Sequence, residues 1–520
     1  MTVEFRVAKT LQSLNLFLES MGKSISLYDL PMLHANMDNV NGEFPREIQD
    51  EMSIQIPPED YEAERKLNLE QRKAFSMIID TIQKGKCGIF FIDGPGGTGK
   101  TFLYRALLAH LRSKKLIAIA TATSGVAAAI MPGGRTAHSR FKIPIDANES
   151  SECTMSKQSG AAELLRQSKL FLWDEAPMAK RWAIENVDKL LKDVMGNDQD
   201  FGGKVVVFGG DFRQVLPVVP KATIHQTISA SLVRSYLWTR MKKFSLTINM
   251  RAKNDAEFSE FLLRVGNGEE PTDNEGNIRI PEEMIVTYDN EEDSIKRLIR
   301  AIFPSLNARA HSADYMTGRA ILAAKNEHVD RLNETLISLF PGEEKIFNSF
   351  DEAIDDTNNY YEEEFLNSLT PNGLPPHKLV LKENCPIILL RNLDPSNGLC
   401  NGTRMVCRKF KDNVIDAQIV FGQHSGKHVF VPRIPLSPAE HEGYPFQFKR
   451  KQFPIRLCFA MTINKAQGQT IPNVGVYLPQ SVFSHGQLYV ALSRGTSMST
   501  TKVLIKQTPI ISEERCGPEM

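Results

Sequence analysis

A glycine-rich run between an apolar segment and a helical segment carries the clearest chemistry in the chain. It reads Gly94-Pro-Gly-Gly-Thr-Gly99-Lys100-Thr101 and follows the apolar residues Cys87–Asp93. Glycines let successive backbone N–H groups converge on phosphates, and a helix that begins at Thr101 adds its positive N-terminal end. Lys100 supplies charge to the β- and γ-phosphates, and the Thr101 hydroxyl can ligate Mg²⁺. The predicted nucleotide-binding residues of this loop are Gly94, Gly96, Gly97, Thr98, Gly99, Lys100 and Thr101.

Two carboxylates follow the apolar run Leu170–Trp173. Asp174 stands where the Mg²⁺ of a bound nucleotide needs an oxygen ligand, and Glu175 can polarise the attacking water. Such a pair is common at strand ends, but beside a phosphate loop it favours ATP hydrolysis. A GTPase is disfavoured because Asn464-Lys465-Ala466-Gln467 lacks the aspartate of a guanine-reading Asn-Lys-x-Asp. The predicted metal ligands are therefore Thr101 and Asp174.

A third segment with candidate functional residues follows the apolar run Lys204–Phe208. Its Gly209-Gly210 turn is expected to direct Asp211 and Gln214 away from the end of the strand. Short apolar runs alternate with helical patterns through this part of the chain, which predicts a parallel sheet with helices on both faces. The predicted strands are 87–93, 116–122, 170–173 and 204–208, and the predicted helices include 101–111 and 182–195.

The composition is that of a globular, multidomain protein. The chain has 520 residues, of which 42% are hydrophobic and 24% charged, and single cores stop growing near ~250–300 residues. Lys+Arg and Asp+Glu both number 62, so any nucleic acid must be held by a local basic groove. The 7 cysteines contain no Cys-x-x-Cys pair, which indicates reduced thiols and gives no zinc site. We expect an intracellular protein without a membrane span or secretory signal.

The pattern of short apolar runs and turn residues predicts an inserted module in the second half of the chain. Short strand-like runs separated by turn signals such as Asn401-Gly402 predict a small antiparallel β module over residues 382–455, while an acidic stretch at 343–364 is typical of a solvated, mobile insertion. The predicted domains are an N-terminal extension and linker at 1–66, a first lobe at 67–250, two parts of a second lobe at 251–381 and 456–508, and a tail at 509–520.

The order of these segments resembles superfamily one DNA helicases, and further motifs make the resemblance close. Together they resemble the PIF-type (petite integration frequency) helicases, particularly the plant and Helitron-transposon branch, over about residues 67–505. Ala323-Ala324 departs from the Thr-Pro pair common there, and no replication-initiator His-x-His nuclease motif is present. The additional motifs are Leu67–Gln71, Ala122–Ala128, Gly133–Phe141, Leu246–Arg251, Gly373–His377, Ile387–Asn392 with Gly398–Arg404, Ala460–Thr470 and Leu488–Gly495.

The resemblance implies an α/β fold in which two RecA-like P-loop lobes with parallel sheets hold ATP and Mg²⁺ between them, together with a small inserted antiparallel β-barrel module and a short N-terminal extension. It implies hydrolysis of ATP to ADP and phosphate, coupled to 5′-to-3′ movement on single-stranded DNA and to duplex unwinding. Gln71 resembles the adenine-reading glutamine. The implied catalytic residues are Lys100, Glu175, Gln214, Arg251 and Arg494.

DNA contacts are expected on the opposite edge of the lobes. Hydroxyls and cations can bind phosphates without reading sequence, and aromatic side chains can stack on bases. Residues 133–150 resemble a protruding wedge element at a duplex junction. The basic cluster Lys449-Arg450-Lys451 is either a solvated face or part of the DNA track. The predicted DNA-binding residues are Thr123, Ser124, His138, Phe141, Thr462, Lys465 and Tyr489.

The expected partners are single-stranded and forked duplex DNA, with no membrane, for a monomeric or weakly self-associating protein whose protein partners the sequence does not specify. We expect a role in DNA repair, recombination, telomere or genome maintenance, in the nucleus or alternatively the mitochondrion. Three other interpretations stay open: a RecD-type helicase subunit of a nuclease complex, a transposon-derived relic that binds single strands with little turnover, and an ATP-gated binding module.

Overall fold

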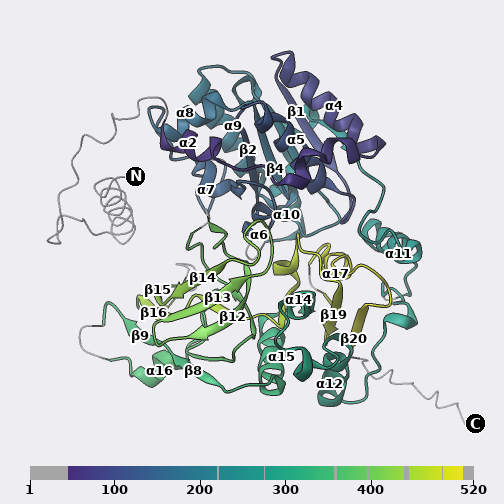
Figure 1. The fold of residues 1–520 in the computed structure, drawn as a ribbon, viewed down its shortest axis with the longest axis vertical. Helices are drawn as coiled ribbons and strands as arrows, with labels where there is room; N and C mark the ends of the chain where they lie inside the picture. The colour runs from purple at the N-terminus through teal and green to yellow at the C-terminus, as the bar shows by residue number, and fades with distance from the viewer. Residues whose placement is uncertain are drawn as a thin grey trace, which may run out of the picture.

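The computed structural model places most of the chain in two α/β lobes and an antiparallel domain (Figure 1). Residues 1–44 of the predicted N-terminal extension and the predicted tail at 509–520 lie outside the described residues. The structure describes residues 45–219, 222–274, 276–356, 360–394, 397–438, 444–482 and 484–506.

The first lobe is built on a six-stranded sheet in the order β3-β2-β4-β5-β1-β6, in which all the paired strands are parallel. The strands are β1 (Gly88–Asp93), β2 (Ala118–Ala122), β3 (Arg135–Thr136), β4 (Leu170–Asp174), β5 (Val205–Gly210) and β6 (Lys242–Ser245). The helices are α2 (Arg46–Met52), α3 (Pro58–Tyr61), α4 (Leu69–Gln83), α5 (Lys100–Ser113), α6 (Gly125–Ala129), α7 (Ala137–Phe141), α8 (Gly160–Gln167), α9 (Arg181–Met195) and α10 (Ile224–Ala230).

Alternating side chains explain why this sheet is buried on both faces. In β1, Phe90 packs into the core on one face, and Phe91 packs into the core on the other. In β4, Leu172 and Trp173 divide between the same two cores. Because neighbouring parallel strands end at the same edge, the loops after β1, β4 and β5 are brought together there.

The second lobe contains a four-stranded parallel sheet in the order β18-β7-β19-β20. Its strands are β7 (Arg319–Ala323), β18 (Ala460–Thr462), β19 (Asn473–Leu478) and β20 (Thr501–Ile505). Its helices are α11 (Ala256–Asn267), α12 (Glu291–Ile302), α13 (Leu306–Arg309), α14 (Ala313–Thr317), α15 (Asn326–Leu339) and α17 (Gln487–Leu492). Short 3₁₀ turns of the two lobes are η3 (Ala63–Lys66), η4 (Ala176–Met178), η5 (Asp200–Gly203), η6 (Leu232–Arg234), η7 (Trp238–Arg240), η8 (Glu282–Met284) and η11 (Ile463–Ala466). The prediction of two lobes with parallel sheets is confirmed.

Strands between Lys345 and Leu457 form an antiparallel domain (residues 345–457), drawn in green beside the second lobe in Figure 1. It contains a five-stranded sheet in the order β14-β13-β12-β11-β17, a three-stranded sheet in the order β15-β16-β9, and the pair β10-β8. The elements are β8 (Lys345–Asn348), β9 (Phe350–Ala353), α16 (Glu363–Ser368), β10 (Lys378–Leu381), β11 (Pro386–Leu389), β12 (Arg404–Phe410), β13 (Val414–Ile419), β14 (His428–Pro432), β15 (Ile434–Leu436), β16 (Phe448–Gln452) and β17 (Ile455–Leu457).

One hydrophobic core joins the antiparallel domain to the second lobe. Ile321 and Tyr477 of the parallel sheet belong to the same buried cluster as Ile387 and Ile415 of the five-stranded sheet. The opposite face of the parallel sheet is covered by a separate cluster that includes Phe258 of α11. The two units therefore share buried apolar surface, which resists their separation.

The acidic stretch at 343–364 differs from its prediction as a solvated, mobile insertion. It contributes β8 and β9, which pair with β10 and β16 of the antiparallel domain. Its Asp351 carboxylate is fully buried and accepts hydrogen bonds from the Arg450 guanidinium, of which the shortest are Nη2 to Oδ2 at 2.6 Å and Nε to Oδ1 at 2.9 Å. Ordering of this stretch is thus driven by strand pairing and by an ion pair that bridges 99 residues of sequence.

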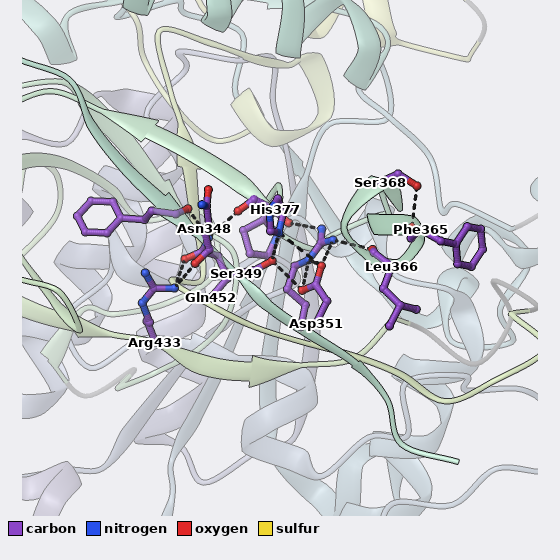
Figure 2. Close-up of polar contacts among 12 residues, drawn as sticks. Asn348, Ser349, Asp351, Phe365, Leu366, Ser368, His377, Arg433 and Gln452 are labelled. Carbon is purple, nitrogen blue, oxygen red and sulfur yellow. Dashed lines mark hydrogen bonds and ion pairs between the residues drawn. The ribbon is translucent and has the colours of Figure 1, made fainter. Parts of the chain in front are cut away.

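The same network buries Arg450 of the basic cluster, and Figure 2 shows its partners Asp351 and Leu366. Besides Asp351, the Arg450 side chain donates to the carbonyls of Pro375 at 3.1 Å and Leu366 at 3.4 Å. Lys449 pairs with Glu352 at 2.7 Å. Arg450 is therefore used inside the fold, whereas Lys451 is exposed, so a DNA-track role stays a prediction for the two lysines.

The predicted wedge element also differs in the structure. Within residues 133–150, β3 pairs with β2 at the edge of the first sheet, and α7 follows directly. Phe141 is 1% exposed and stacks on Trp173 with ring centroids 5.9 Å apart. The prediction that Phe141 contacts DNA is wrong, because its aromatic ring packs into the core of the first lobe.

The buried ion pair yields a stability prediction. Asp351→Ala should lower the free energy of unfolding by about 3–5 kcal/mol, because it leaves the buried Arg450 charge uncompensated. Denaturant-induced unfolding monitored by circular dichroism measures the loss. Glu352→Ala, which removes a solvent-exposed pair on the neighbouring residue, is the matched control and should cost about 0–1 kcal/mol. Equal effects of the two variants would contradict the assignment.

Candidate active site

The glycine-rich loop joins β1 to α5 in a conformation that requires two of its glycines. Gly97 has φ 96° and Gly99 has φ 80°, both in the left-handed region that favours glycine. A Cβ on Gly97 would lie 2.6 Å from Oδ1 of Asn249, and one on Gly99 would lie 2.5 Å from Nε2 of Gln71. Close approach of two neighbouring segments therefore fixes the loop around the helix N-terminus.

The loop offers backbone donors to an anion. Among the described residues, the N–H groups of Gly97, Gly99, Lys100 and Thr101 have no hydrogen-bond acceptor. The Lys100 side chain is 9% exposed, and its ammonium group donates to the carbonyl of Gly94. Convergent N–H groups at a helix N-terminus with a lysine beside them suit a phosphate chain. The loop residues present thus fit the triphosphate of a nucleotide.

The Gln71 side chain forms a hydrogen bond with the glycine-rich loop. Its backbone and side chain form a capping box with Asn68 at the start of α4. Its Nε2 donates to the carbonyl of Thr98 at 3.2 Å. The structure therefore brings Gln71 to the nucleotide loop, while its reading of adenine stays a prediction.

The two carboxylates lie at the carboxyl end of β4 and are each 6% exposed. Glu175 adopts φ 53°, and its N–H donates to Oδ1 of Asp174 at 2.9 Å. Burial, followed by the negative charge of Asp174, raises the pKa of Glu175 to about 7, and the Lys100 cation opposes this shift. A carboxylate with a pKa near neutrality is suited to accept a proton from water.

Two arginines that follow the first lobe in the sequence, Arg251 and Arg494, face the glycine-rich loop. Arg251 Nη1 donates to the carbonyl of Ser493 at 2.8 Å, and Arg494 Nη2 donates to Oγ of Ser493 at 2.9 Å. Arg494 Nη2 and Arg251 Nη1 lie 3.5 and 3.6 Å from the position that a Cβ on Gly96 would occupy. Burial and the neighbouring Arg494 cation lower the pKa of Arg251 to about 9. A phosphate bound at Gly96 would relieve this repulsion, so the pair suits an anionic ligand.

Tyr489 belongs to this site and does not contact DNA as predicted. It is 3% exposed, its hydroxyl accepts from the N–H of Gly96 at 3.1 Å, and it donates to Oδ2 of Asp211 at 3.0 Å. Gln214 Nε2 donates to the same carboxylate oxygen at 3.3 Å, and Gln214 Oε1 is buried without a partner among the described residues. The available sequence signal was that Tyr489 stands five residues before Arg494 in the motif Leu488–Gly495.

A Mg²⁺ ion would be held here together with the nucleotide. The expected protein ligands are the Thr101 hydroxyl in the first turn of α5 and the Asp174 carboxylate at the end of β4, and no cluster of three or more His, Cys, Asp or Glu side chains in the described residues could hold a metal. Mg²⁺ is commonly bound by one or two protein oxygens plus substrate phosphates, so the donor set fits a magnesium–nucleotide complex.

A cleft of about 1260 Å³ lies beside the nucleotide site, between the lobes and the antiparallel domain. Val126 and Arg135 line it from the first lobe, Gly468 and Gln469 from the second, and Asn397 from the antiparallel domain. Among the described residues, the Arg135 guanidinium has no hydrogen bond or ion pair. The cleft therefore offers an unpaired cation on a surface that both lobes share.

The remaining predicted DNA-binding residues are not among those that line this cleft. Ser124 caps α6, accepting from the N–H of Ala127 at 3.2 Å. Thr462 is the N-cap residue of η11, Lys465 lies in its last turn, and burial lowers the pKa of Lys465. Burial and the Lys180 cation lower the pKa of half-buried His138. Their contact with DNA stays a prediction, as does that of Thr123, whose hydroxyl lies inside the lobe.

The fold and the site together define a P-loop nucleotide-binding protein with two RecA-like lobes. A family model described as PIF1-like helicase matches residues 66–276, and one described as the 2B domain of the DNA helicase Pif1 matches residues 364–410. Over these residues the chain is therefore similar to PIF1-like helicases.

Individual relatives agree with the family models. The chain is 26% identical over 431 residues to the ATP-dependent DNA helicase PIF1 of Xenopus laevis, covering 82% of this chain and 60% of that protein. It is 26% identical to the ATP-dependent DNA helicase RRM3 of Saccharomyces cerevisiae, covering 84% of this chain and 65% of that protein. The chain thus spans less than two thirds of the length of these curated relatives.

Solved structures establish the fold. The Pif1 helicase of Candida albicans matches with a TM-score of 0.59 at 23% identity, covering 84% of this chain and 94% of that one. The Bacteroides Pif1 helicase in complex with ADP-AlF3 and ssDNA matches with a TM-score of 0.60 at 22% identity, covering 84% and 92%. In the part of the chain that the structure describes, no helix is long and apolar enough to cross a membrane.

Removal of the loop lysine tests the nucleotide site. Lys100→Ala should lower the affinity for magnesium–ATP by about tenfold or more, because a buried cation that balances phosphate charge is lost. Isothermal titration calorimetry measures this change. Lys114→Ala, at the opposite end of the same helix, should bind as the wild type does. Unchanged affinity in Lys100→Ala would exclude Lys100 as a phosphate ligand.

Proposed function

We propose that this protein is an ATP-dependent DNA helicase that moves on single-stranded DNA and unwinds duplex DNA. The observation that carries the proposal is the convergence of groups from both lobes on one phosphate loop beside a shared cleft. Gln469 belongs to both places, because it lines the cleft while its carbonyl accepts from Arg494 Nη1 at 3.0 Å. Relatives named as ATP-dependent DNA helicases, and a related structure with ADP-AlF3 and ssDNA, support it.

In the proposed reaction each residue acts on charge or on a proton. Lys100 balances the phosphate charge, and Glu175 takes the proton of the attacking water. Arg251 and Arg494 stabilise charge that develops in the transition state, and Gln214 senses the γ-phosphate by donating from its amide N–H group. Magnesium, when bound with ATP at Thr101 and Asp174, supplies further neutralisation of phosphate charge.

The shared cleft is the proposed DNA path. Arg135 is free to bind a phosphate there, and the turn Asn401-Gly402 closes against α6, since a Cβ on Gly125 would lie 2.8 Å from the Asn401 carbonyl oxygen. Contacts to phosphates and backbone groups do not read bases, so binding should be independent of sequence.

The direction of movement and the biological setting are parts of the same proposal. The motifs support 5′-to-3′ movement, membership of the plant and Helitron-like branch, and a role in repair, recombination or telomere maintenance in the nucleus or mitochondrion. We also propose that the protein works as a monomer or weak self-associate. The first lobe is assigned to residues 67–250 and the second to 251–381 and 456–508.

Turnover measurements test the proposal most directly. Single-stranded DNA should raise the steady-state ATPase rate of the wild type, and a forked duplex with a 5′ tail should be unwound faster than one with a 3′ tail. Glu175→Gln should bind ATP but hydrolyse it slowly. Arg494→Ala should lower kcat by about 10³-fold or more while nucleotide affinity stays within about tenfold. The reason is that an arginine that contacts the transferred phosphoryl group acts mainly in the transition state. A wild-type rate that DNA does not change would overturn the helicase proposal.

Salt dependence tests the proposed DNA path. Arg135→Ala should weaken single-stranded DNA binding and reduce the slope of log K against log salt by about 0.7, because one phosphate contact is lost. Fluorescence anisotropy at several salt concentrations measures both. Lys157→Ala, which removes a cation paired with Asp193 on another surface, is the control. If Arg135→Ala kept the wild-type slope, the cleft would not be the DNA path.

A further inference from the structure

Two loops from different lobes hold the Glu175 residue in the structure. From the second lobe, Gln467 Nε2 donates to Oε2 of Glu175 at 3.4 Å, and Gln467 is 3% exposed. From the first lobe, the Thr123 hydroxyl donates to the backbone carbonyl of Glu175 at 2.8 Å and accepts from Trp173 Nε1 at 3.1 Å. Gln467 thus positions the side chain of Glu175, and Thr123 positions its main chain.

Both loops continue directly into the cleft. Gly468 and Gln469, which follow Gln467, line it, and so does Val126, three residues after Thr123. The loops also approach each other, because a Cβ on Gly468 would lie 3.7 Å from the Ala127 side chain. A DNA backbone in this cleft therefore contacts residues one to three positions away from both groups that hold Glu175.

The second-lobe loop is internally braced, so it moves as a unit. Gln469 Nε2 donates to the Lys465 carbonyl at 3.0 Å, and the Gln469 N–H donates to the Ala466 carbonyl at 3.1 Å. Arg494 is tied to the same loop through the Gln469 carbonyl. A displacement at the cleft is consequently carried both to the Gln467 amide and to the cross-lobe arginine.

The Gln467 amide is only partly used in this arrangement. Its contact with Glu175 is at the long end of the hydrogen-bond range, and its Oε1 is buried without a partner among the described residues. Buried polar atoms are normally paired, so a small rearrangement of the loop can improve this side chain's interactions. The arrangement therefore leaves room for the contact between Gln467 and Glu175 to become shorter.

We propose that Gln467 and Thr123 are positioning residues through which DNA in the cleft orients the Glu175 carboxylate toward the attacking water. This inference rests on the proposed function and adds the route by which DNA accelerates hydrolysis. The two residues act through Glu175 and do not touch the reacting atoms. This role differs from a role in packing, because its loss lowers the ratio of kcat with DNA to kcat without DNA.

Matched variants test the second-lobe contact. Gln467→Met keeps the length of the side chain and removes the amide, so the ratio of kcat with DNA to kcat without DNA should fall by about fivefold or more, while the ATP KM stays within about twofold. Affinity for single-stranded DNA and the thermal midpoint should also stay close to wild type. Gln83→Met, at the exposed end of α4, is the control and should keep the wild-type ratio.

The first-lobe contact has its own variant pair, which also serves if Gln467→Met fails to fold. Thr123→Val removes the hydroxyl at constant shape and should lower the same ratio, whereas Thr123→Ser should restore it. Equal loss of both rates, or unchanged rates in the folded variants, would overturn the inference. A wild-type enzyme without DNA stimulation would instead overturn the proposed function, so the two failures are distinguishable.

Discussion

Burial of opposite charges between the lobes is the constraint on which the rest of this structure depends. Glu175 and Asp174 lose hydration at the end of β4, and Arg251 and Arg494 lose it on the facing segment. Buried charges are tolerated only when oppositely charged or hydrogen-bonding groups are close by. Each lobe carries part of the set, so the site is complete only when both lobes face the same loop.

The scaffold meets this constraint with rigid attachments. The parallel sheet of each lobe delivers its loops to one edge, and a shared core fixes the antiparallel domain to the second lobe. On the first lobe, α2 is held by Glu51, which pairs with Arg112 at 3.1 Å and with Arg140 at 2.8 Å. The cleft between these units is therefore walled by elements whose positions are set by buried contacts.

The nucleotide site and the cleft share backbone segments instead of communicating over a long distance. The segment from Lys465 to Gln469 carries a contact to Glu175, a contact to Arg494 and part of the cleft wall. Coupling between two sites requires an element whose arrangement both of them bias, and this segment meets that requirement at short range.

Four strands of the first sheet, the phosphate loop and the Asp174-Glu175 pair could be predicted from the sequence. These features follow from local periodicity and from backbone angles that only glycine adopts easily, so neighbouring residues suffice to predict them. The folded structure was needed to show that Phe141 is a core residue, that Tyr489 bridges Gly96 and Asp211, and that Arg450 is neutralised by Asp351. Partners in these contacts come from distant parts of the chain, and a side chain's local pattern does not encode which distant group will face it after folding.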